Sequence, residues 1–360
     1  MKKYIIISTY PETGSKNIGD QLITTALIEA IKFVKGSNII IDVVWREESW
    51  EKIKDKIRSS DAIIFACLAI RPNMSTKEYP YLSKLLELDI PMGIISSGTS
   101  LPVNYLDKGT YDYVNNETRS LLQELDKKSV FFSTRGYLTQ GFCDNIGLNK
   151  SKFSGDIAFF NKNNKINPFN INVEIKKIVV SDPHYSIEFM GSFITLIEGL
   201  GVVFPNAEII IALHGNDQLI INYAKENGIQ YEEIYKRKDD GLNIYDDADL
   251  HVGYRVHAHV SSLKRGMYSY LLEQDGRGCD YGLTINKKLS VPSYRQPKSK
   301  LDKVLTKLGF SIDTVSKSPV NQILAMIKQD RNQGFNKFSG LEQQINYFSK
   351  STTDNLNLLP

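Results

Sequence analysis

The sequence contains few cysteines and lacks the patterns that cysteines form in disulfide-bonded or zinc-binding proteins. Cys67, Cys143 and Cys279 are the only ones in 360 residues. Their number is odd and their spacing is wide, whereas disulfide frameworks and zinc sites use closely grouped cysteines in characteristic spacings. We therefore expect reduced thiols and no metal site.

Long hydrophobic runs are also absent. A membrane-spanning helix needs about 20 consecutive apolar residues, and no stretch of this sequence approaches that length. The N-terminal segment MKKYIIISTYPE has the lysines of a signal peptide, but its apolar run soon ends at a polar loop that contains a proline. We therefore expect a cytoplasmic protein without stable membrane insertion.

Neither sign of charge is in large excess. The net charge is +3 and the isoelectric point is near 8.4, too mild for a nucleic-acid-binding protein. We therefore exclude nucleic acid as a partner and expect any bound anion to be small. The sequence also has no GxGxxG motif next to a strand and no Walker loop, which removes the main support for a dinucleotide-binding or P-loop function.

What the sequence does contain is a regular alternation of short, β-branched apolar segments with longer amphipathic ones. This alternation predicts parallel strands joined by crossover helices, which defines the fold class as α/β. In the first half, an amphipathic helix is expected at 24–34. The strands expected there are 4–8, 39–44, 62–66, 92–97 and 130–134.

The alternation stops at residues 161–176, a segment rich in Asn and Lys, and then resumes. The strands expected after it are 177–182, 208–214, 248–254 and 267–273. We predict two Rossmann-like domains that face a cleft, at 1–165 and 166–330, followed by a helical tail at 331–360. Because ligands in such sheets bind beyond the carboxyl ends of the strands, the loops after the strands should hold the site.

Five of these loops offer polar side chains, backbone N–H groups or glycines. They are NIGD at 17–20, SSGTS at 96–100, STRGYLTQ at 133–140, SGDIAFF at 154–160 and EQDGRGCDYG at 273–282. Helix N-termini with small residues bind anions, although ordinary caps and turns explain each loop equally well. Asp20 lies where the cap of the following helix is expected. The candidate substrate-binding residues are Asn17, Gly19, Asp20, Ser97, Gly98, Thr99, Arg135, Asp156, Asp275 and Arg277.

The segment GYRVHAHVSSLKRG at 253–266 adds two histidines and three cationic side chains. Arg255 and His257 lie where a strand is expected to turn into a helix, so we expect them to meet a ligand. His259 lies beside the apolar stripe of that helix and is expected to be structural. The two histidines are not spaced i, i+4, so they do not form the metal-binding pair of an HExxH motif.

Taken together, NIGD, SSGTS, STRGYLTQ, SGDIAFF, ADLHVGYRVHAHVSSLKRG and YLLEQDGRG resemble a divergent member of the polysaccharide pyruvyl transferase family over about the first 285 residues. The resemblance implies a glycosyltransferase-B-like fold with C-terminal helices. It also implies transfer of pyruvate from phosphoenolpyruvate to two hydroxyls of one sugar, which forms a cyclic ketal in surface polysaccharide biosynthesis. The family's usual Gly-x-Pro turn is replaced by Gly266, Met267 and Tyr268.

The resemblance also implies roles for individual residues. His257 occupies the family's catalytic position, where it would protonate the enol methylene carbon of phosphoenolpyruvate. Arg255 would hold the phosphate or carboxylate of that donor, because an arginine fork matches both groups. Arg135 and Arg277 are the next candidates for the same contact. Asp20 or Asp156 would orient or deprotonate an acceptor hydroxyl. The N-terminal domain is expected to bind the acceptor and the C-terminal domain the donor.

Two other functions stay open. A glycosyltransferase of the same architecture would hold a nucleotide diphosphate with Arg255 and the ribose with Glu273. A non-catalytic binding subunit of a polysaccharide assembly system would keep the fold without turnover. The expected partners are phosphoenolpyruvate and a sugar that is free, lipid-linked or nucleotide-linked. The resemblance implies that the protein works at the inner face of the membrane. No cofactor is expected, and a homo-oligomer is one of the open assembly states.

Overall fold

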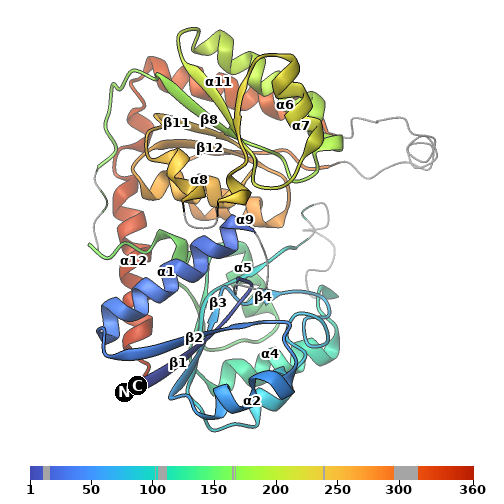
Figure 1. Cartoon of the computed structure of the whole chain (residues 1–360), viewed down its shortest axis with the longest axis vertical. Coiled ribbons are helices and arrows are strands. Elements are labelled where there is room, and N and C mark those ends of the chain that lie inside the picture. Colours follow the sequence, from blue (N-terminus) through green and yellow to red (C-terminus); the bar gives the residue numbers. More distant parts are fainter. Residues whose placement is uncertain are drawn as a thin grey trace, which may run out of the picture. The chain divides into compact units, whose positions relative to one another are not determined.

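A computed structural model of the chain describes residues 1–10, 17–101, 103, 112–163, 166, 168–237, 240–295 and 315–360. The chain forms two compact units, each built on one sheet (Figure 1). The first unit comprises Met1–Ile166 together with Gln343–Pro360, and the second comprises Asn167–Glu342. The expected helical tail at 331–360 is therefore not a separate part, because its residues are divided between the two units.

In the first unit the strands pair in the order β2-β1-β3-β5-β6-β7, with β4 beside β5, and every pair is parallel. The strands are β1 (Lys2–Ser8), β2 (Ile39–Trp45), β3 (Ala62–Ala66), β4 (Ala69–Ile70), β5 (Met92–Thr99), β6 (Ser129–Thr134) and β7 (Ser151–Phe153). The helices are α1 (Ile18–Lys35), α2 (Trp50–Arg58), α3 (Leu82–Leu86), α4 (Asn116–Lys128), α5 (Tyr137–Asn145), the 3₁₀ turn η3 (Ile157–Phe159) and α12 (Leu341–Asn357).

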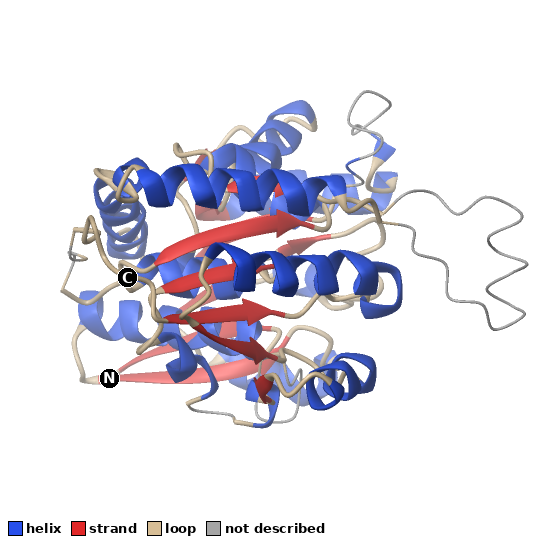
Figure 2. Ribbon diagram, turned by 90° about the horizontal axis from the view of Figure 1, so that it is seen from above, coloured by secondary structure: helices blue, strands red, loops and turns tan. Residues whose placement is uncertain are grey.

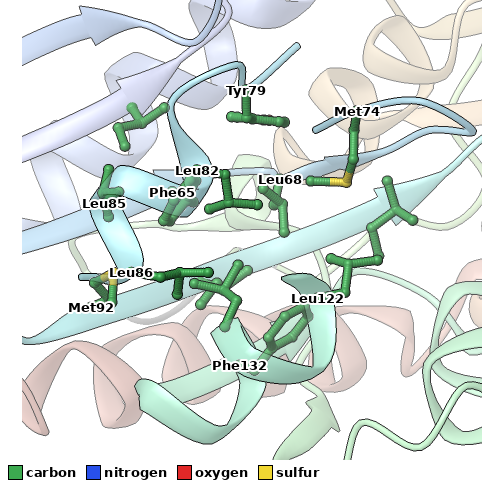
Figure 3. Packing of buried hydrophobic residues seen from close by; sticks show 14 of the residues in the cluster. Phe65, Leu68, Met74, Tyr79, Leu82, Leu85, Leu86, Met92, Leu122 and Phe132 are labelled. Atoms are coloured by element: carbon green, nitrogen blue, oxygen red, sulfur yellow. The ribbon is translucent and has the colours of Figure 1, made fainter. Parts of the chain in front are cut away.

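The central strands of this sheet are largely buried because both faces are covered. Every residue of β3 is buried, as is every residue of β5. On one face, Phe65 and Phe132 pack with Leu122 of α4 and with Tyr79 and Leu82 at α3 (Figure 3). This cluster is the larger of the two apolar cores of the first unit.

The opposite face is closed by α1 and by the C-terminal segment of the chain. Leu356 and Leu359 join the core that contains Ile6, and the Lys35 ammonium at the end of α1 donates to the carbonyl of Leu359. The last helix therefore completes the first unit, although the chain between Ile166 and Gln343 belongs to the second.

In the second unit the order is β10-β9-β8-β11-β12-β13, again with parallel pairs. The strands are β8 (Lys177–Ser181), β9 (Glu208–Ala212), β10 (Gln230–Glu232), β11 (Leu250–Gly253), β12 (Tyr268–Glu273) and β13 (Ser290–Pro292). The helical elements are α6 (Ser186–Val203), α7 (Gln218–Glu226), η4 (Ile234–Lys236), η5 (Gly241–Tyr245), α8 (Val256–Lys264), α9 (Gly276–Thr284), α11 (Ser318–Asn332) and η6 (Asn336–Phe338).

One described helix, α6, is long and apolar enough by length and composition to cross a membrane. The expectation of no such stretch is therefore corrected for this helix. It is weak evidence for a span, because core helices of globular domains pass the same test. Phe189, Phe193, Leu196 and Leu200 are buried along one side of α6.

Each sheet reverses its strand order beside its first strand. In the first unit, β2 lies on one side of β1 and β3 on the other; in the second, β9 and β11 flank β8 in the same way. Within a sheet the arrows run in the same direction, with helices packed alongside (Figure 2). Parallel α/β sheets bind ligands at such reversal points, beyond the carboxyl ends of the strands. The loops after β1 and β3, and after β8 and β11, are therefore the places to look for a site.

Replacing Gly155 by alanine should destabilise the first unit. Gly155 has φ +88°, and an added Cβ would lie 2.3 Å from Cγ of Phe348 in α12. Strain and overpacking together predict a loss of about 2 kcal/mol or more in the free energy of unfolding. Urea unfolding followed by tryptophan fluorescence checks this, because both tryptophans, Trp45 and Trp50, lie in this unit.

Gly141→Ala is the matched control. Gly141 lies inside α5 with no atom within 4 Å of an added Cβ, so the change should stabilise the unit by about 0.5 to 1 kcal/mol. Equal stability of the two variants would show that α12 does not pack tightly against Gly155.

Candidate functional site

In the second unit, a buried ion pair joins the loops after β8 and β11. The Arg255 guanidinium donates from Nη2 to Oδ2 of Asp182 at 2.6 Å and from Nε to Oδ1 at 3.0 Å. The Asp182 side chain is fully buried, and its Oδ1 also accepts the backbone N–H of His214 at 3.0 Å. Burial raises the pKa of Asp182, and Arg255 opposes that shift. The pair sits at the reversal of strand order.

This pairing decides which edge of Arg255 can meet a ligand. The Nε and Nη2 edge is occupied by Asp182, and Nη1 lies 3.3 Å from Nδ1 of His184. A guanidinium has five N–H groups, and Nη2 also donates to the carbonyl of Pro183 at 3.4 Å. Nη1 is therefore the nitrogen that these contacts leave most available to an anion, and the expected fork recognition of a donor by Arg255 would have to displace one of them.

His184 follows the same strand as Asp182 and was not among the predicted residues. Its backbone N–H donates to Oε1 of Gln274 at 2.8 Å, and Gln274 in turn donates to the carbonyl of Tyr254 at 2.9 Å. Because Arg255 has no acceptor, Nδ1 of His184 must accept and Nε2 carries the proton. Burial lowers the pKa of His184, and the charges of the nearby arginines lower it further. The ring is exposed and neutral at pH 7.

His257 lies in the first turn of α8, two residues after Arg255. Its ring is half-buried, with Nε2 shielded from solvent. The structure therefore places the two residues expected to be catalytic on one turn, next to the loop after β8. Their roles remain predictions.

The loop after β12 holds its polar residues in internal contacts. Asp275 caps α9 by accepting the backbone N–H of Arg277 at 2.9 Å and also pairs with that guanidinium at 2.6 Å. Burial favours a higher pKa for Asp275, but Arg277 holds it below its usual value. Asp275 thus serves as a helix cap, and both it and Arg277 are partly exposed.

Glu273, the last residue of β12, is 3% exposed. One carboxylate oxygen accepts the hydroxyl of Ser290 and the other that of Tyr294, each at 2.6 Å. Gly282 packs closely against this carboxylate, since an added Cβ would lie 2.2 Å from Oε1. Both oxygens of Glu273 are therefore engaged inside the unit.

In the first unit, the start of α1 differs from the expectation in one respect. The cap is Asn17, whose Oδ1 accepts the backbone N–H of Gly19 at 2.9 Å. Asp20 was expected at the cap, but it lies in the first turn and is partly exposed. Its carboxylate is thus not used for capping. The rest of the preceding loop, 11–16, is outside the described residues.

The predicted residues of the loops after β5 and β6 meet in one place. Arg135 is 8% exposed. Its Nη2 donates to the carbonyl of Thr99 at 3.2 Å, and its backbone N–H donates to the carbonyl of Ser97 at 3.0 Å. A Cβ on Gly98 would lie 2.4 Å from Cζ of Arg135. Gly98 is therefore required so that the guanidinium can lie across the end of β5.

Cys67, directly after β3, is a buried thiol whose pKa depends on three charged residues of this unit. Burial raises the pKa of its thiol well above the usual value; Asp156 and Asp20 raise it further, and Arg135 lowers it. Asp156 itself is buried and caps η3 by accepting the backbone N–H of Ala158 at 2.7 Å. Three predicted residues thus act electrostatically on a thiol that no sequence motif marks, and the raised pKa keeps that thiol protonated.

The backbone at this edge is strained. Cys67 and Ser96, on neighbouring strands, have φ +50° and +54°, a conformation that costs side-chain-bearing residues about 1 to 3 kcal/mol and gathers at functional sites. Two arginines that the sequence did not single out, Arg46 after β2 and Arg71 after β4, lie at the same edge. Arg46 interacts electrostatically with Asp20.

Within the described parts of the chain, no group of three or more His, Cys, Asp or Glu side chains is arranged to hold a metal ion. The three cysteines are buried and form no disulfide.

Acidification should destabilise the second unit more than the first. Burial lowers the pKa of His259 to about 3, and it lowers those of His251 and His214 well below the usual value. These rings are protonated near pH 6.5 in the unfolded chain but stay neutral in the folded one, so stability is full above pH 6.5 and falls as the pH drops toward 3. Each of these histidines should lower the free energy of unfolding by about 1 kcal/mol between pH 7 and pH 5.5.

The measurement is urea unfolding at the two pH values by far-ultraviolet circular dichroism, with tryptophan fluorescence as the internal control. All five histidines lie in the second unit and both tryptophans in the first, so the tryptophan transition should move little. His259→Asn should lose about 1 kcal/mol less on acidification than the unchanged protein. Equal pH dependence of the two transitions would contradict the buried neutral histidines.

Comparison with solved structures identifies the fold. The Staphylococcus aureus MnaA–UDP co-structure has a TM-score of 0.50 and 11% identity, and the match covers 99% of this chain and 94% of that one. A putative UDP-N-acetylglucosamine 2-epimerase from Listeria monocytogenes gives 0.50 and 11%, covering 92% and 98%. The wall teichoic acid polymerase TagF gives 0.48 and 10%, covering 99% and 89%. The predicted fold class is confirmed: two Rossmann-like domains of the glycosyltransferase-B type, with C-terminal helices.

At these identities the likeness shows the fold alone, and no curated protein matches the sequence. The family comparison is more specific. The family described as polysaccharide pyruvyl transferase matches residues 17–266, a range that runs from the cap of α1 to the end of the α8 segment. The chain therefore belongs to the polysaccharide pyruvyl transferase family.

Proposed function

We propose that this protein transfers pyruvate from phosphoenolpyruvate to two hydroxyls of a sugar, forming a cyclic ketal in the cytoplasmic stages of surface polysaccharide biosynthesis. The observation that carries the proposal is the turn after β11. There Arg255 is fixed by the buried carboxylate of Asp182, with His257 two residues further on, inside the range that the family matches.

The charges at this turn suit the donor. Phosphoenolpyruvate carries a phosphate and a carboxylate, so its pocket needs fixed hydrogen-bond donors of positive or neutral charge. Arg255 offers Nη1, Arg277 is 38% exposed, and His184 offers Nε2–H. Because Asp182 holds the Arg255 guanidinium before any ligand arrives, little side-chain entropy is lost when the donor binds.

The reaction needs a general acid, and we assign this role to His257, which lies two residues after Arg255. It would give a proton to the methylene carbon, which becomes a methyl group, and the neighbouring carbon would take up one sugar hydroxyl oxygen as that hydroxyl loses its proton. The bond to the phosphate oxygen then breaks, phosphate leaves, and the second hydroxyl closes the ketal with loss of its own proton. Positioned acids of this kind contribute about 100-fold to 10,000-fold to a rate.

Transfer of a sugar from a nucleotide donor is the second candidate, since the Staphylococcus aureus relative was solved with UDP. In that case Glu273 was expected to bind the ribose. Its two oxygens already accept the hydroxyls of Ser290 and Tyr294, and the side chain is 3% exposed. This weighs against the nucleotide-sugar reaction.

Phosphoenolpyruvate should stabilise the protein against heat. A ligand at about 100 times its dissociation constant contributes about 2.7 kcal/mol, and Arg255→Ala should abolish the shift in Tm. Arg265→Ala is the matched control, because Arg265 lies at the opposite end of α8 and should leave the shift intact. A panel of nucleotide sugars is measured in parallel; a shift with those ligands alone would contradict the proposal in favour of glycosyl transfer.

His257→Ala should lower phosphate release from phosphoenolpyruvate by about 100-fold or more, measured with a panel of sugars that carry free diols. The Tm of the variant and the shift caused by phosphoenolpyruvate are measured alongside, and both should be kept because the change removes the acid and leaves Arg255 and Asp182 in place. Undiminished release would refute the acid role. Donor binding in the unchanged protein without release for any acceptor would favour a binding subunit.

A further inference from the structure

Four buried polar side chains form a line through the second unit, beneath the turn that carries Arg255. They are Ser181 of β8, His251 of β11, Ser269 of β12 and His259 of α8, none more than 1% exposed. Strand register explains the line. His251 pairs with Ser269, and Ser181 pairs with Gly253, two residues after His251 and therefore on the same face of β11.

The contacts along this line are short. Ser181 Oγ lies 2.9 Å from Nε2 of His251, Nδ1 of His251 lies 2.7 Å from Oγ of Ser269, and that oxygen lies 2.7 Å from Nδ1 of His259. Each contact joins two groups that can either donate or accept. Distances alone therefore leave the direction of the hydrogen bonds open.

The backbone sets the direction. Ser181 Oγ accepts the backbone N–H of Tyr254 at 3.1 Å and that of Arg255 at 3.2 Å. These two bonds use both of its lone pairs, so its own hydrogen must go to Nε2 of His251. A neutral His251 then carries its proton on Nδ1 and donates it to Ser269. Ser269 has its hydroxyl hydrogen left for Nδ1 of His259, whose proton is on Nε2.

Both rings are neutral, as this direction requires. Burial lowers the pKa of His259 to about 3, and burial together with His259 lowers that of His251. A proton added to either ring would put two donors against each other, because every acceptor along the line is already matched to one donor.

We propose that Ser181 is a positioning residue for Arg255, and that Ser181, His251, Ser269 and His259 form one directional chain of hydrogen bonds that fixes the turn bearing Arg255 and His257. We refer to these four residues as the serine–histidine chain. Its consequence for turnover rests on the proposed function, whereas its structure does not.

The two residues at the ends of the serine–histidine chain, Ser181 and His259, both bond the backbone of Arg255. Ser181 accepts the N–H of Arg255, and the N–H of His259 donates to the carbonyl of Arg255 at 3.0 Å. The next residue after Ser181 is Asp182, which holds the guanidinium. One dipeptide of the β8 loop thus fixes both the backbone and the side chain of Arg255.

Gly253 makes this arrangement possible. A Cβ at Gly253 would lie 2.4 Å from Oγ of Ser181 and 2.5 Å from its carbonyl oxygen. Only glycine lets β11 come close enough to β8 for the Ser181 hydroxyl to reach the backbone N–H groups of Tyr254 and Arg255.

The first experiment determines which ring nitrogens carry protons. The full-length protein is labelled with ¹⁵N-histidine, and long-range ¹H–¹⁵N NMR spectra are recorded at pH 7. We expect His251 protonated on Nδ1 only and His259 on Nε2 only. Protonation of His251 on Nε2, or on both nitrogens, would overturn the chain whatever the activity of the protein.

The second experiment tests positioning without relying on turnover. With ¹⁵N-arginine label, Ser181→Ala should shift the Arg255 Nε–H resonance and speed its exchange with water, because the turn that carries the guanidinium is released. Ser192→Ala is the matched control: Ser192 is equally buried and bonds the hydroxyl of Tyr254 at 2.7 Å, outside the chain. An Arg255 resonance that responds equally to both variants, or to neither, would overturn the positioning role.

Phosphate release provides the functional comparison. Ser181→Ala should lower kcat by up to about 100-fold through misplacement of Arg255 and His257, whereas Ser192→Ala should not. Full kcat in Ser181→Ala would also overturn the positioning role. If the ring protons and the Arg255 resonance behave as expected while the unchanged protein releases no phosphate, the chain is supported and the proposed reaction fails.

Discussion

The ion pair between Asp182 and Arg255 is the interaction on which the second unit's site depends. A carboxylate taken out of water costs several kcal/mol unless its oxygens are satisfied. Here Oδ1 accepts from Nε of Arg255 and from the backbone of His214, and Oδ2 accepts from Nη2. Because the pair spans the reversal of strand order, it ties the loops after β8, β9 and β11 together. His257 takes its position from the same turn.

The strands could be predicted from the sequence because each central strand is a short apolar run with helices on both faces. Every strand expected in the two sheets is present within a few residues. The edge strands β7, β10 and β13 were missed, since three residues carry no periodic signal. The return of α12 to the first unit was missed as well, because it depends on contacts such as Phe348 against Gly155, far apart in sequence.

The candidate site was predicted in its location and only partly in its members. The rule that loops after strands hold ligands selected Arg135, Gly98 and Asp156, which the structure places at one edge, and Arg255 at another. Asp182 and His184 follow β8 and obey the same rule, but no motif marks them. Their importance comes from a partner more than 70 residues away, which spacing along the chain does not reveal.

Histidine burial narrows the choice of a proton donor. A general acid must hold a proton that it can release near neutral pH. His214, His251 and His259 are buried and neutral, with pKa values below the usual range. His184 accepts a hydrogen bond from an arginine at Nδ1, so a second proton there would face a cation. His257 lies in the first turn of α8, two residues after Arg255, and the buried histidines hold the frame in which it sits.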